Sequence, residues 1–304
     1  MNGLSQTNQH HWNGRSSAWI ETAVEGLPND NTFDQCLVNN AQIKPGDDIL
    51  DIAAGTGDPA ISVGVALKGQ SSIIACDLTS AMLDVAVSRA QYVGIEKFSC
   101  ASTDMMSLSY RDESFDCVTC RFGLMFAPNK VEAAKEALRV LKPGGRAAYM
   151  VWGAYSDNPA FFIIRQTIAD ILNQTEGPPP QRHCLGDKGQ LVNILKKAGY
   201  KDTKEVEIRY RRPVENLDQY IGRALSRGYS DSVERLNKSE VENLVKNIKN
   251  RFKVYKENNK IFLVNGRQNQ EIHPLWLRER ANTEAVSYTH LRAHETRHDR
   301  VCRL

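Results

Sequence analysis

The chain has 304 residues, of which 41% are hydrophobic and 25% are charged, and both values are ordinary for a soluble globular protein. A net charge of +3 does not indicate a nucleic-acid partner, and no apolar run approaches the roughly 18 to 20 residues that span a membrane. The seven cysteines are scattered and odd in number, and the N-terminus lacks the charged and apolar segments of a secretory signal. We therefore expect a cytoplasmic protein without an integral membrane segment.

The first 40 residues carry Trp12, Trp19 and Phe33 among polar residues, which predicts short helices before the first strand. The strand Asp48 to Ile52 follows. It ends in a glycine turn, and a helix is predicted from about Pro59 to Lys68. A strand, a glycine turn and a helix in this order form the ligand-binding corner of a doubly wound α/β sheet.

Gly55 and Gly57 have no Cβ, so the backbone can turn sharply there and a ligand can approach the main chain. Such a corner binds either the pyrophosphate of a dinucleotide or S-adenosylmethionine, which has no phosphate and carries a cationic sulfonium. Asp51 lies four residues before Gly55, and an acid there suits a cationic tail and repels a pyrophosphate.

The pattern Asp51-x-x-x-Gly55-x-Gly57 resembles the first motif of class I S-adenosylmethionine-dependent methyltransferases. The resemblance implies that Asp51, Ala53, Gly55 and Gly57 hold the amino-acid end of the cofactor. The glycines alone leave the ligand open, because Gly55-x-Gly57-x-x-Ala60 also satisfies the dinucleotide fingerprint. For the first 40 residues the resemblance implies a cap over the cofactor, and a helix packed on the sheet edge is the alternative.

Asp77 follows the second predicted strand, twenty residues after Gly57. An acid in this position accepts hydrogen bonds from both hydroxyls of a ribose, whichever nucleoside is bound. In the methyltransferase family the next residue and a Met four positions further on flank the adenine, and here these are Leu78 and Met82. A Met at helical spacing is also typical of plain core, so Met82 alone decides nothing.

Asp104 comes just beyond the predicted third strand, residues 97–101, and Met105 follows it. The resemblance implies that Asp104 accepts the amino group of the adenine while the backbone N–H of Met105 contacts the ring. An Asp that caps a turn is the alternative. After the fourth predicted strand, Arg121 and Phe122 lie beside the switch point of the sheet, where they would face the transferred group, and Arg121 is a candidate for contact with the cofactor or the acceptor.

The segment Leu141-Lys142-Pro143-Gly144-Gly145 predicts a turn before a fifth strand, residues 147–152. Together the matches to the methyltransferase family cover residues 44–152. In this region the chain resembles the branch of the family that is related to ubiquinone and menaquinone methyltransferases. We therefore expect an α/β fold with a Rossmann-like, doubly wound, seven-stranded methyltransferase sheet and helical insertions. The expected parts are an N-terminal helical cap at 1–40, a cofactor-binding core at 41–153, substrate-covering insertions and C-terminal strands at 154–265, and a doubtful segment at 266–304.

After Trp152 the pattern changes to an insertion with a predicted helix at 160–172 and a lone His183. His183 is a candidate base for an acidic O–H or C–H, and a histidine on a surface loop is the alternative. A strand is predicted at 203–211, a long helical stretch at 217–255, and a final strand at 260–264, about where the family has its last antiparallel strand.

The function that these features predict is methyl transfer from S-adenosylmethionine to a small molecule, possibly quinone-like or aromatic. An NAD(P)-dependent oxidoreductase and a non-catalytic relative that binds the nucleoside are the alternatives. We expect no metal and no nucleic acid. The acceptor, the methylated atom and the oligomeric state do not follow from the sequence.

Residues 286–304 resemble the in-frame translation of a sequencing adapter rather than protein, and we exclude them from the fold prediction. His290, His294 and His298 lie on one helical face and would predict a metal site if this segment were native. With the segment excluded, the native end falls between about residue 266 and residue 285, and the spacing of the histidines is accidental.

Overall fold

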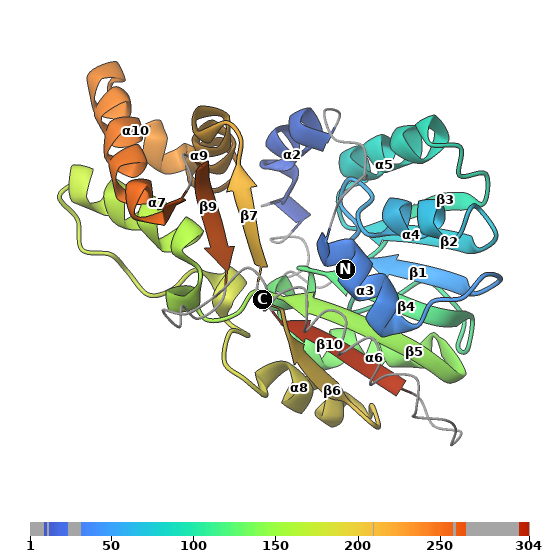
Figure 1. Ribbon diagram of the computed structural model, residues 1–304. Coiled ribbons are helices and arrows are strands. Elements are labelled where there is room, and N and C mark those ends of the chain that lie inside the picture. The colour runs from blue at the N-terminus through green and yellow to red at the C-terminus, as the bar shows by residue number, and fades with distance from the viewer. Residues whose placement is uncertain are drawn as a thin grey trace.

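A parallel sheet forms the centre of the computed structural model, which describes residues 9–10, 12–23, 32–208, 210–257, 260–265 and 298–303. Five strands lie side by side in the order β3-β2-β1-β4-β5 and pair in parallel (Figure 1). They are β1 (Asp48–Ile52), β2 (Ser72–Asp77), β3 (Phe98–Ser102), β4 (Phe115–Arg121) and β5 (Leu141–Val151). The predicted α/β class is confirmed, and the strand order reverses between β1 and β4, where such sheets bind ligands.

Helices cover both faces of this sheet because successive strand residues point to opposite sides. Ile49 and Cys117 pack in one buried cluster with residues of α3 (Thr32–Ala41) and α4 (Ala60–Ala66). Leu50 and Cys120 pack in another with residues of α6 (Lys130–Arg139) and α8 (Gln190–Ala198). The remaining helix of this half, α5 (Ser80–Tyr92), contacts β2 and β3.

The segment from 141 to 145, predicted as a turn, is the first part of β5. Phe115 pairs with Leu141 and Cys117 pairs with Arg146, so the extra residues of β5 form a bulge opposite β4. The Pro-Gly-Gly segment therefore lies inside β5 and bends it. It is not a separate turn before the strand.

Beyond β5 the sheet continues through β10 (His298–Arg303) and β6 (Lys204–Glu207), both parallel, so that seven strands are hydrogen-bonded in one sheet (Figure 1). The strand beside β5 comes from the segment that we excluded from the fold prediction. Its backbone pairs with residues 146–151 of β5 and with residues 204–207 of β6. The interpretation of residues 286–304 as non-native stays a prediction, and residues 286–297 lie outside the described part of the chain.

A second group of elements follows β5 and builds its own core. It contains α7 (Pro159–Ile171), α9 (Leu217–Val233) and α10 (Lys238–Phe252), and a sheet of β7 (Tyr210–Val214), β9 (Lys260–Asn265) and β8 (Lys256–Glu257) in that order. Ile164, Ile221, Leu244 and Phe252 are buried together between the helices. In Figure 1 these elements stand to one side of the parallel sheet, on the side of its carboxyl ends.

Two predictions for this group are wrong in detail. The predicted final strand at 260–264 is antiparallel, but it pairs with β7 and β8 and not with the central sheet. The single strand predicted at 203–211 is two strands, β6 and β7, in different sheets, because the chain crosses from one sheet to the other.

The helical stretch predicted at 217–255 is confirmed. It is divided into α9 and α10, since Asn237 begins α10 with a capping box in which Glu240 is the partner.

Short elements complete the described chain: α2 (Ser16–Ala23) and the 3₁₀ turns η1 (Leu124–Phe126), η2 (Tyr155–Asp157), η3 (Gln181–His183) and η4 (Lys253–Tyr255). Among the described residues, no helix combines the length and the apolar character that crossing a bilayer requires.

Gly57 provides a test of the turn at the centre of this fold. Its φ is +107°, and a Cβ there would lie 2.6 Å from Cδ1 of Ile61 and 3.1 Å from Cβ of Ala86. Gly46 also has a positive φ, +91°, but a Cβ there would meet nothing within 4 Å. We expect Gly57→Ala to lower the free energy of unfolding by about 1–3 kcal/mol more than Gly46→Ala, because only the first substitution adds a steric clash to the backbone strain. Urea unfolding followed by circular dichroism measures both, and equal losses would contradict the packing of this turn.

Candidate functional site

The turn between β1 and α4 has a backbone that few side chains tolerate. Ala53, Gly55 and Gly57 have φ values of +57°, +53° and +107°. The N–H of Gly57 donates to the carbonyl of Ala54 at 2.8 Å, and the N–H of Ala54 donates to the carbonyl of Cys76 at 3.0 Å. The turn is therefore closed on itself and tied to the end of β2.

Asp51 holds this turn from below. Its side chain is fully buried: Oδ1 accepts a hydrogen bond from the hydroxyl of Thr119 at 2.7 Å, and Oδ2 accepts one from the N–H of Ala60 at 3.2 Å. Burial raises its pKa to about 7, although both hydrogen bonds lower it. Both oxygens of Asp51 thus point into the protein and support the turn, and a direct contact of Asp51 with a cationic tail stays a prediction.

Asp77 connects the turn to the next two loops. Its Oδ2 accepts from the N–H of Gly55 at 2.9 Å, and its Oδ1 accepts from the N–H of Thr79 at 2.9 Å. Its backbone carbonyl accepts from the N–H of Thr103 at 3.0 Å, which brings the end of β3 beside it. Burial raises the pKa of Asp77, and its backbone hydrogen bonds lower it.

Leu78 and Met82 lie beside this acid. The carbonyl of Leu78 accepts a hydrogen bond from Nε2 of Gln9 at 3.1 Å, so the N-terminal segment contacts the loop after β2. Met82 is buried, and its sulfur would be 3.9 Å from a Cβ at Gly55. The two residues thus adjoin the turn and Asp77.

Asp104 lies on the loop after β3, where its Oδ1 accepts from the N–H of Met106 at 2.9 Å. Met105, between these two residues, is half-buried and packs against the core cluster of β4 and α6. The loop ends of β1, β2 and β3 are therefore joined by hydrogen bonds, with Asp77 between the glycine turn and the loop of Asp104.

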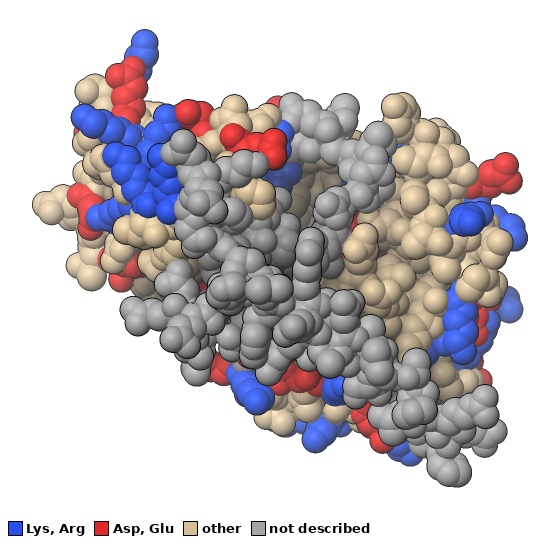
Figure 2. Space-filling view, viewed as in Figure 1, with Lys and Arg blue, Asp and Glu red and all other residues tan. Residues whose placement is uncertain are grey.

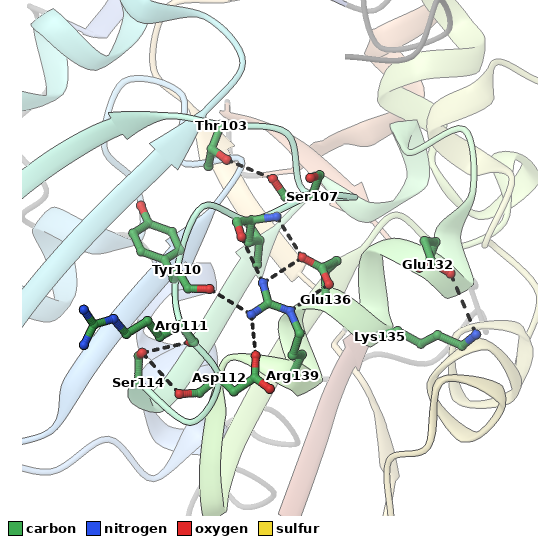
Figure 3. A network of polar contacts seen from close by, with 11 residues as sticks. Thr103, Ser107, Tyr110, Arg111, Asp112, Ser114, Glu132, Lys135, Glu136 and Arg139 are labelled. Carbon is green, nitrogen blue, oxygen red and sulfur yellow. Dashed lines mark hydrogen bonds and ion pairs between the residues drawn. The ribbon is translucent and has the colours of Figure 1, made fainter.

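Arg139 at the end of α6 fastens the segment that follows Asp104 (Figure 3). Its guanidinium donates to the carbonyls of Leu108 and Tyr110 at 2.9 and 2.8 Å, and to the carboxylates of Asp112 and Glu136. Glu136 in turn accepts the N–H of Leu108 at 2.9 Å. Hydrogen bonding with Glu136 and Asp112 raises the pKa of Arg139, and its hydrogen bonds lower the pKa of Glu136.

A group of charges under the end of β4 was missed by the sequence analysis. Arg121 pairs with Asp34 of α3 at 2.7 Å and lies 3.9 Å from Asp58, which also pairs with Arg89 of α5 at 3.1 Å. Asp34 is fully buried, and burial raises its pKa while Arg121 lowers it. No motif spacing marks Asp34, because it lies 87 residues from Arg121 and only the fold brings the two together. Arg121 is therefore held between acids.

Aromatic rings line the ends of β4 and β5. Phe122 and Trp152 stack with ring centroids 4.4 Å apart and planes at 6°. Phe33 approaches both rings edge-on, and Phe161 of α7 lies edge-on to Trp152 at 4.8 Å. We call Phe33, Phe122, Trp152 and Phe161 the aromatic wall. It continues from the central sheet toward the helical group.

His183 lies beyond this wall. Its side chain is buried, and its Nδ1 is 2.8 Å from the carbonyl of Gly153. Burial lowers its pKa to about 4, so the ring is neutral at pH 7. The alternative of a histidine on a surface loop is therefore wrong.

Metal ligation was considered for the tail histidines, of which His290 and His294 lie outside the described residues. Within the part of the chain that the structure describes, His, Cys, Asp and Glu form no group of three that could hold a metal ion.

The parallel sheet and its covering helices define a Rossmann-like α/β fold. The [4+2]-cyclase SpnF has a similar structure, with a TM-score of 0.54 at 18% identity over 86% of this chain and 95% of that one. Phosphoethanolamine N-methyltransferase 2 of Haemonchus contortus, in complex with S-adenosylhomocysteine, has a TM-score of 0.51 at 17% identity over 88% of this chain and 61% of that one. At such identities the likeness concerns the fold.

Sequence comparison relates part of the chain to one family. The sequence model of the ubiE/COQ5 methyltransferase family matches residues 19–159. The ubiquinone/menaquinone biosynthesis C-methyltransferase UbiE of Xanthomonas oryzae is 38% identical over 112 residues, and the demethylmenaquinone methyltransferase of Lactobacillus johnsonii is 33% identical over 125 residues. These alignments cover 36% and 41% of this chain and 44% and 51% of the relatives, so the chain spans about half their length. Residues 19–159 thus resemble the ubiE/COQ5 methyltransferase family, the resemblance that the sequence motifs predicted.

A substitution of Arg139 tests whether its guanidinium holds the segment after Asp104 against α6. We expect Arg139→Gln to lower the free energy of unfolding by about 1.5–3 kcal/mol, because charged hydrogen bonds to two carbonyls and two carboxylates are lost. Lys135→Gln is the control, since the Lys135–Glu132 pair on the same helix is exposed and contributes at most about 1 kcal/mol. Urea unfolding at pH 7 measures both, and similar losses would contradict the role of Arg139.

The raised pKa of Asp51 predicts that the free energy of unfolding depends on pH. Its pKa is near 7 in the folded protein and about 4 in an unfolded chain, so between these values the folded state binds the extra proton and stability falls as pH rises. Asp51→Asn removes this slope. Relative to the wild type, we expect the variant to gain about 3 kcal/mol in free energy of unfolding between about pH 4.5 and about pH 7.5.

Urea unfolding over this pH range measures the difference. Asp84→Asn, which changes an exposed carboxylate on α5, is the control. A constant difference between Asp51→Asn and the wild type would show that Asp51 is already ionised at the low end of the range.

Proposed function

We propose that this chain is an S-adenosylmethionine-dependent methyltransferase that acts on a small molecule, quinone-like or aromatic. The observation that carries the proposal is the family match of residues 19–159, which includes Asp51, Asp77 and Asp104 at the carboxyl ends of neighbouring strands. The relatives named for ubiquinone, menaquinone and demethylmenaquinone support a quinone-like acceptor. The proposal includes the seven-stranded methyltransferase sheet with residues 41–153 as the cofactor-binding core, residues 1–40 as its cap and residues 154–265 as the substrate cover.

The residues present fit this cofactor. A carboxylate offers about four lone-pair positions, and each oxygen of Asp77 uses one for a backbone N–H, so the remaining positions can accept the two ribose hydroxyls. Among the described residues, Oδ2 of Asp104 has no hydrogen-bond partner and can accept the amino group of the adenine. Leu78 and Met82 would flank the adenine, and Met105 would contact it through its N–H.

The amino-acid end of the cofactor would lie against the turn of Ala53, Gly55 and Gly57. Asp51 acts there as a positioning residue, because its hydrogen bonds to Thr119 and Ala60 fix the turn. Arg121 would likewise hold Asp34 and Asp58 in place beside the cofactor, and not act on the methyl group itself.

When bound, S-adenosylmethionine supplies an activated methyl group, which moves to the acceptor while the C–S electron pair stays on sulfur and the acceptor gives up a proton. The chain itself has to orient the acceptor and exclude water, and orientation alone contributes about 7–11 kcal/mol in favourable cases. The aromatic wall suits this task, because stacked rings leave an apolar surface beside the ends of β4 and β5.

An NAD(P)-dependent oxidoreductase is the alternative from another class. It requires a pyrophosphate at the start of α4, where buried Asp51 accepts the N–H of Ala60 and Asp58 lies two residues before the helix. A non-catalytic nucleoside-binding relative is the other alternative, because a shared fold does not set the reaction.

Calorimetric titration separates these possibilities. We expect S-adenosylhomocysteine to bind and NAD to show no binding under the same conditions. Asp77→Asn should weaken the binding of S-adenosylhomocysteine about tenfold or more, because two charged hydrogen bonds to the ribose are lost. Asp84→Asn, an exposed carboxylate on α5, is the control and should leave the affinity unchanged. Unchanged affinity in Asp77→Asn would remove the ribose assignment, and tighter binding of NAD would favour the oxidoreductase.

A further inference from the structure

A group of basic and aromatic side chains lies beyond the aromatic wall, between α7, η3 and α9. It consists of Tyr155, Phe161, Arg165, Arg182, His183 and Tyr229, and we call it the Arg182 cluster. Figure 2 shows a hollow in this face of the molecule, between the helical group and the sheet. The charges of the cluster do not balance within the described residues.

Arg182 is the unbalanced charge. Its guanidinium lies 4.9 Å above the ring of Phe161, an arrangement in which the ring face attracts the cation. Among the described residues it forms no hydrogen bond and no ion pair with a carboxylate. Burial lowers its pKa, and nearby Arg15 and Arg165 lower it further. Arg182 is half-buried, and a cation partly removed from water without an anion is costly unless a ligand supplies one.

Unlike Arg182, Arg165 forms an ion pair with a carboxylate. Its Nη1 lies 3.5 Å from Oε1 of Glu176, and the same carboxylate oxygen accepts the hydroxyl of Tyr155. Arg15 lies 3.9 Å from Asp231. The cluster is thus left with one positive charge in excess, on Arg182.

His183 adds an unused acceptor. The carbonyl of Gly153 can only accept, so the hydrogen between them is on Nδ1, and in the neutral ring Nε2 has a lone pair. This Nε2 is buried and has no hydrogen-bond partner among the described residues. The ring centroids of Tyr155 and Phe161 each lie 5.3 Å from that of the imidazole. A ligand beside these rings with an O–H or N–H would complete the hydrogen bonding of Nε2.

The cluster is attached to the ends of β4 and β5. The side chains of Gln181 and Cys184, on either side of Arg182 and His183, reach the carbonyl of Met125 in η1, and Gly153 follows β5 directly. Phe161 belongs both to the cluster and to the aromatic wall, through its contact with Trp152. The cluster therefore lies on the side of the sheet where the proposed function places the methyl acceptor.

We propose that the Arg182 cluster binds an aromatic carboxylate, with the single negative charge on Arg182 and a hydroxyl or amino hydrogen of the ligand donated to Nε2 of His183. The inference rests on the proposed function in one respect, that the ligand is the methyl acceptor. A single excess charge favours a carboxylate over a phosphate monoester, which carries close to two negative charges at pH 7. The substrate class narrows from quinone-like or aromatic compounds to aromatic acids with a hydroxyl or amino group.

The test uses three probes that share a phenol ring: 4-hydroxybenzoate, 4-hydroxybenzamide and 4-hydroxyphenyl phosphate. Each is titrated into the full chain by calorimetry, with and without saturating S-adenosylhomocysteine. We expect 4-hydroxybenzoate to bind about tenfold or more tightly than the other two, because only it matches the charge of Arg182. Equal binding of the amide, tighter binding of the phosphate, or no binding of 4-hydroxybenzoate at millimolar concentration would overturn the proposal.

Arg182→Gln should lower the affinity for 4-hydroxybenzoate about tenfold or more and leave the affinities for 4-hydroxybenzamide and S-adenosylhomocysteine unchanged. Arg235→Gln, an exposed arginine of the same helical group, is the control and should change none of them. An unchanged affinity for 4-hydroxybenzoate in Arg182→Gln would overturn the assignment. If this variant does not fold, the comparison of the three probes on the wild type decides whether the cluster binds a carboxylate.

The two proposals fail separately. If S-adenosylhomocysteine does not bind, the proposed function fails, and the titrations without it still decide whether the cluster takes a carboxylate. If S-adenosylhomocysteine binds and the probes show no preference for 4-hydroxybenzoate, only the inference about the cluster fails.

Discussion

A buried carboxylate under the glycine turn is the constraint on which the rest of the site depends. Asp51 accepts one hydrogen bond from β4, through Thr119, and one from the first residue of α4, Ala60. These bonds fix the turn, and the N–H of Gly55 then meets Asp77 at the end of β2. Burial raises the pKa of Asp51 to about 7, so the group works mainly through hydrogen-bond geometry and only partly through charge. Hydrogen bonds thus connect β4 to the glycine turn and the turn to the end of β2. The carbonyl of Asp77 extends this connection to the end of β3.

Much of this edge could be predicted from the sequence because parallel strands align their carboxyl ends. An acid just after each apolar run is then enough to expect Asp77 and Asp104 near one another. Contacts between distant parts of the chain could not be predicted, since Asp34 meets Arg121 only through the packing of α3 on the sheet. For Asp51 the position at the glycine turn was predicted, but its hydrogen bonds to Thr119 and Ala60 were not, because a sequence does not show which way a carboxylate points. The sequence of residues 260–264 predicts a strand but does not show its partner. The pairing of this strand with β7 depends on the packing of the helical group.

The site divides into two halves with different chemistry. Acids and backbone groups at the ends of β1, β2 and β3 offer acceptors for a nucleoside, and Arg139 holds the third of these loops against α6. Rings at the ends of β4 and β5 form an apolar wall that leads to Arg182 and His183. The family match ends at residue 159, close to the boundary between these halves. The acids and three of the four rings of the aromatic wall therefore lie within the matched segment, whereas Phe161, Arg182 and His183 lie beyond it.

The structure of the protein in complex with S-adenosylhomocysteine tests the central claim most directly. The account predicts the ribose on the carboxylate of Asp77, the adenine between Met82 and the loop of Asp104, and the amino-acid end against Gly55 and Gly57, with Asp51 still bonded to Thr119 and Ala60. A ligand bound elsewhere, or a nucleoside at this edge whose hydroxyls do not contact Asp77, would contradict it.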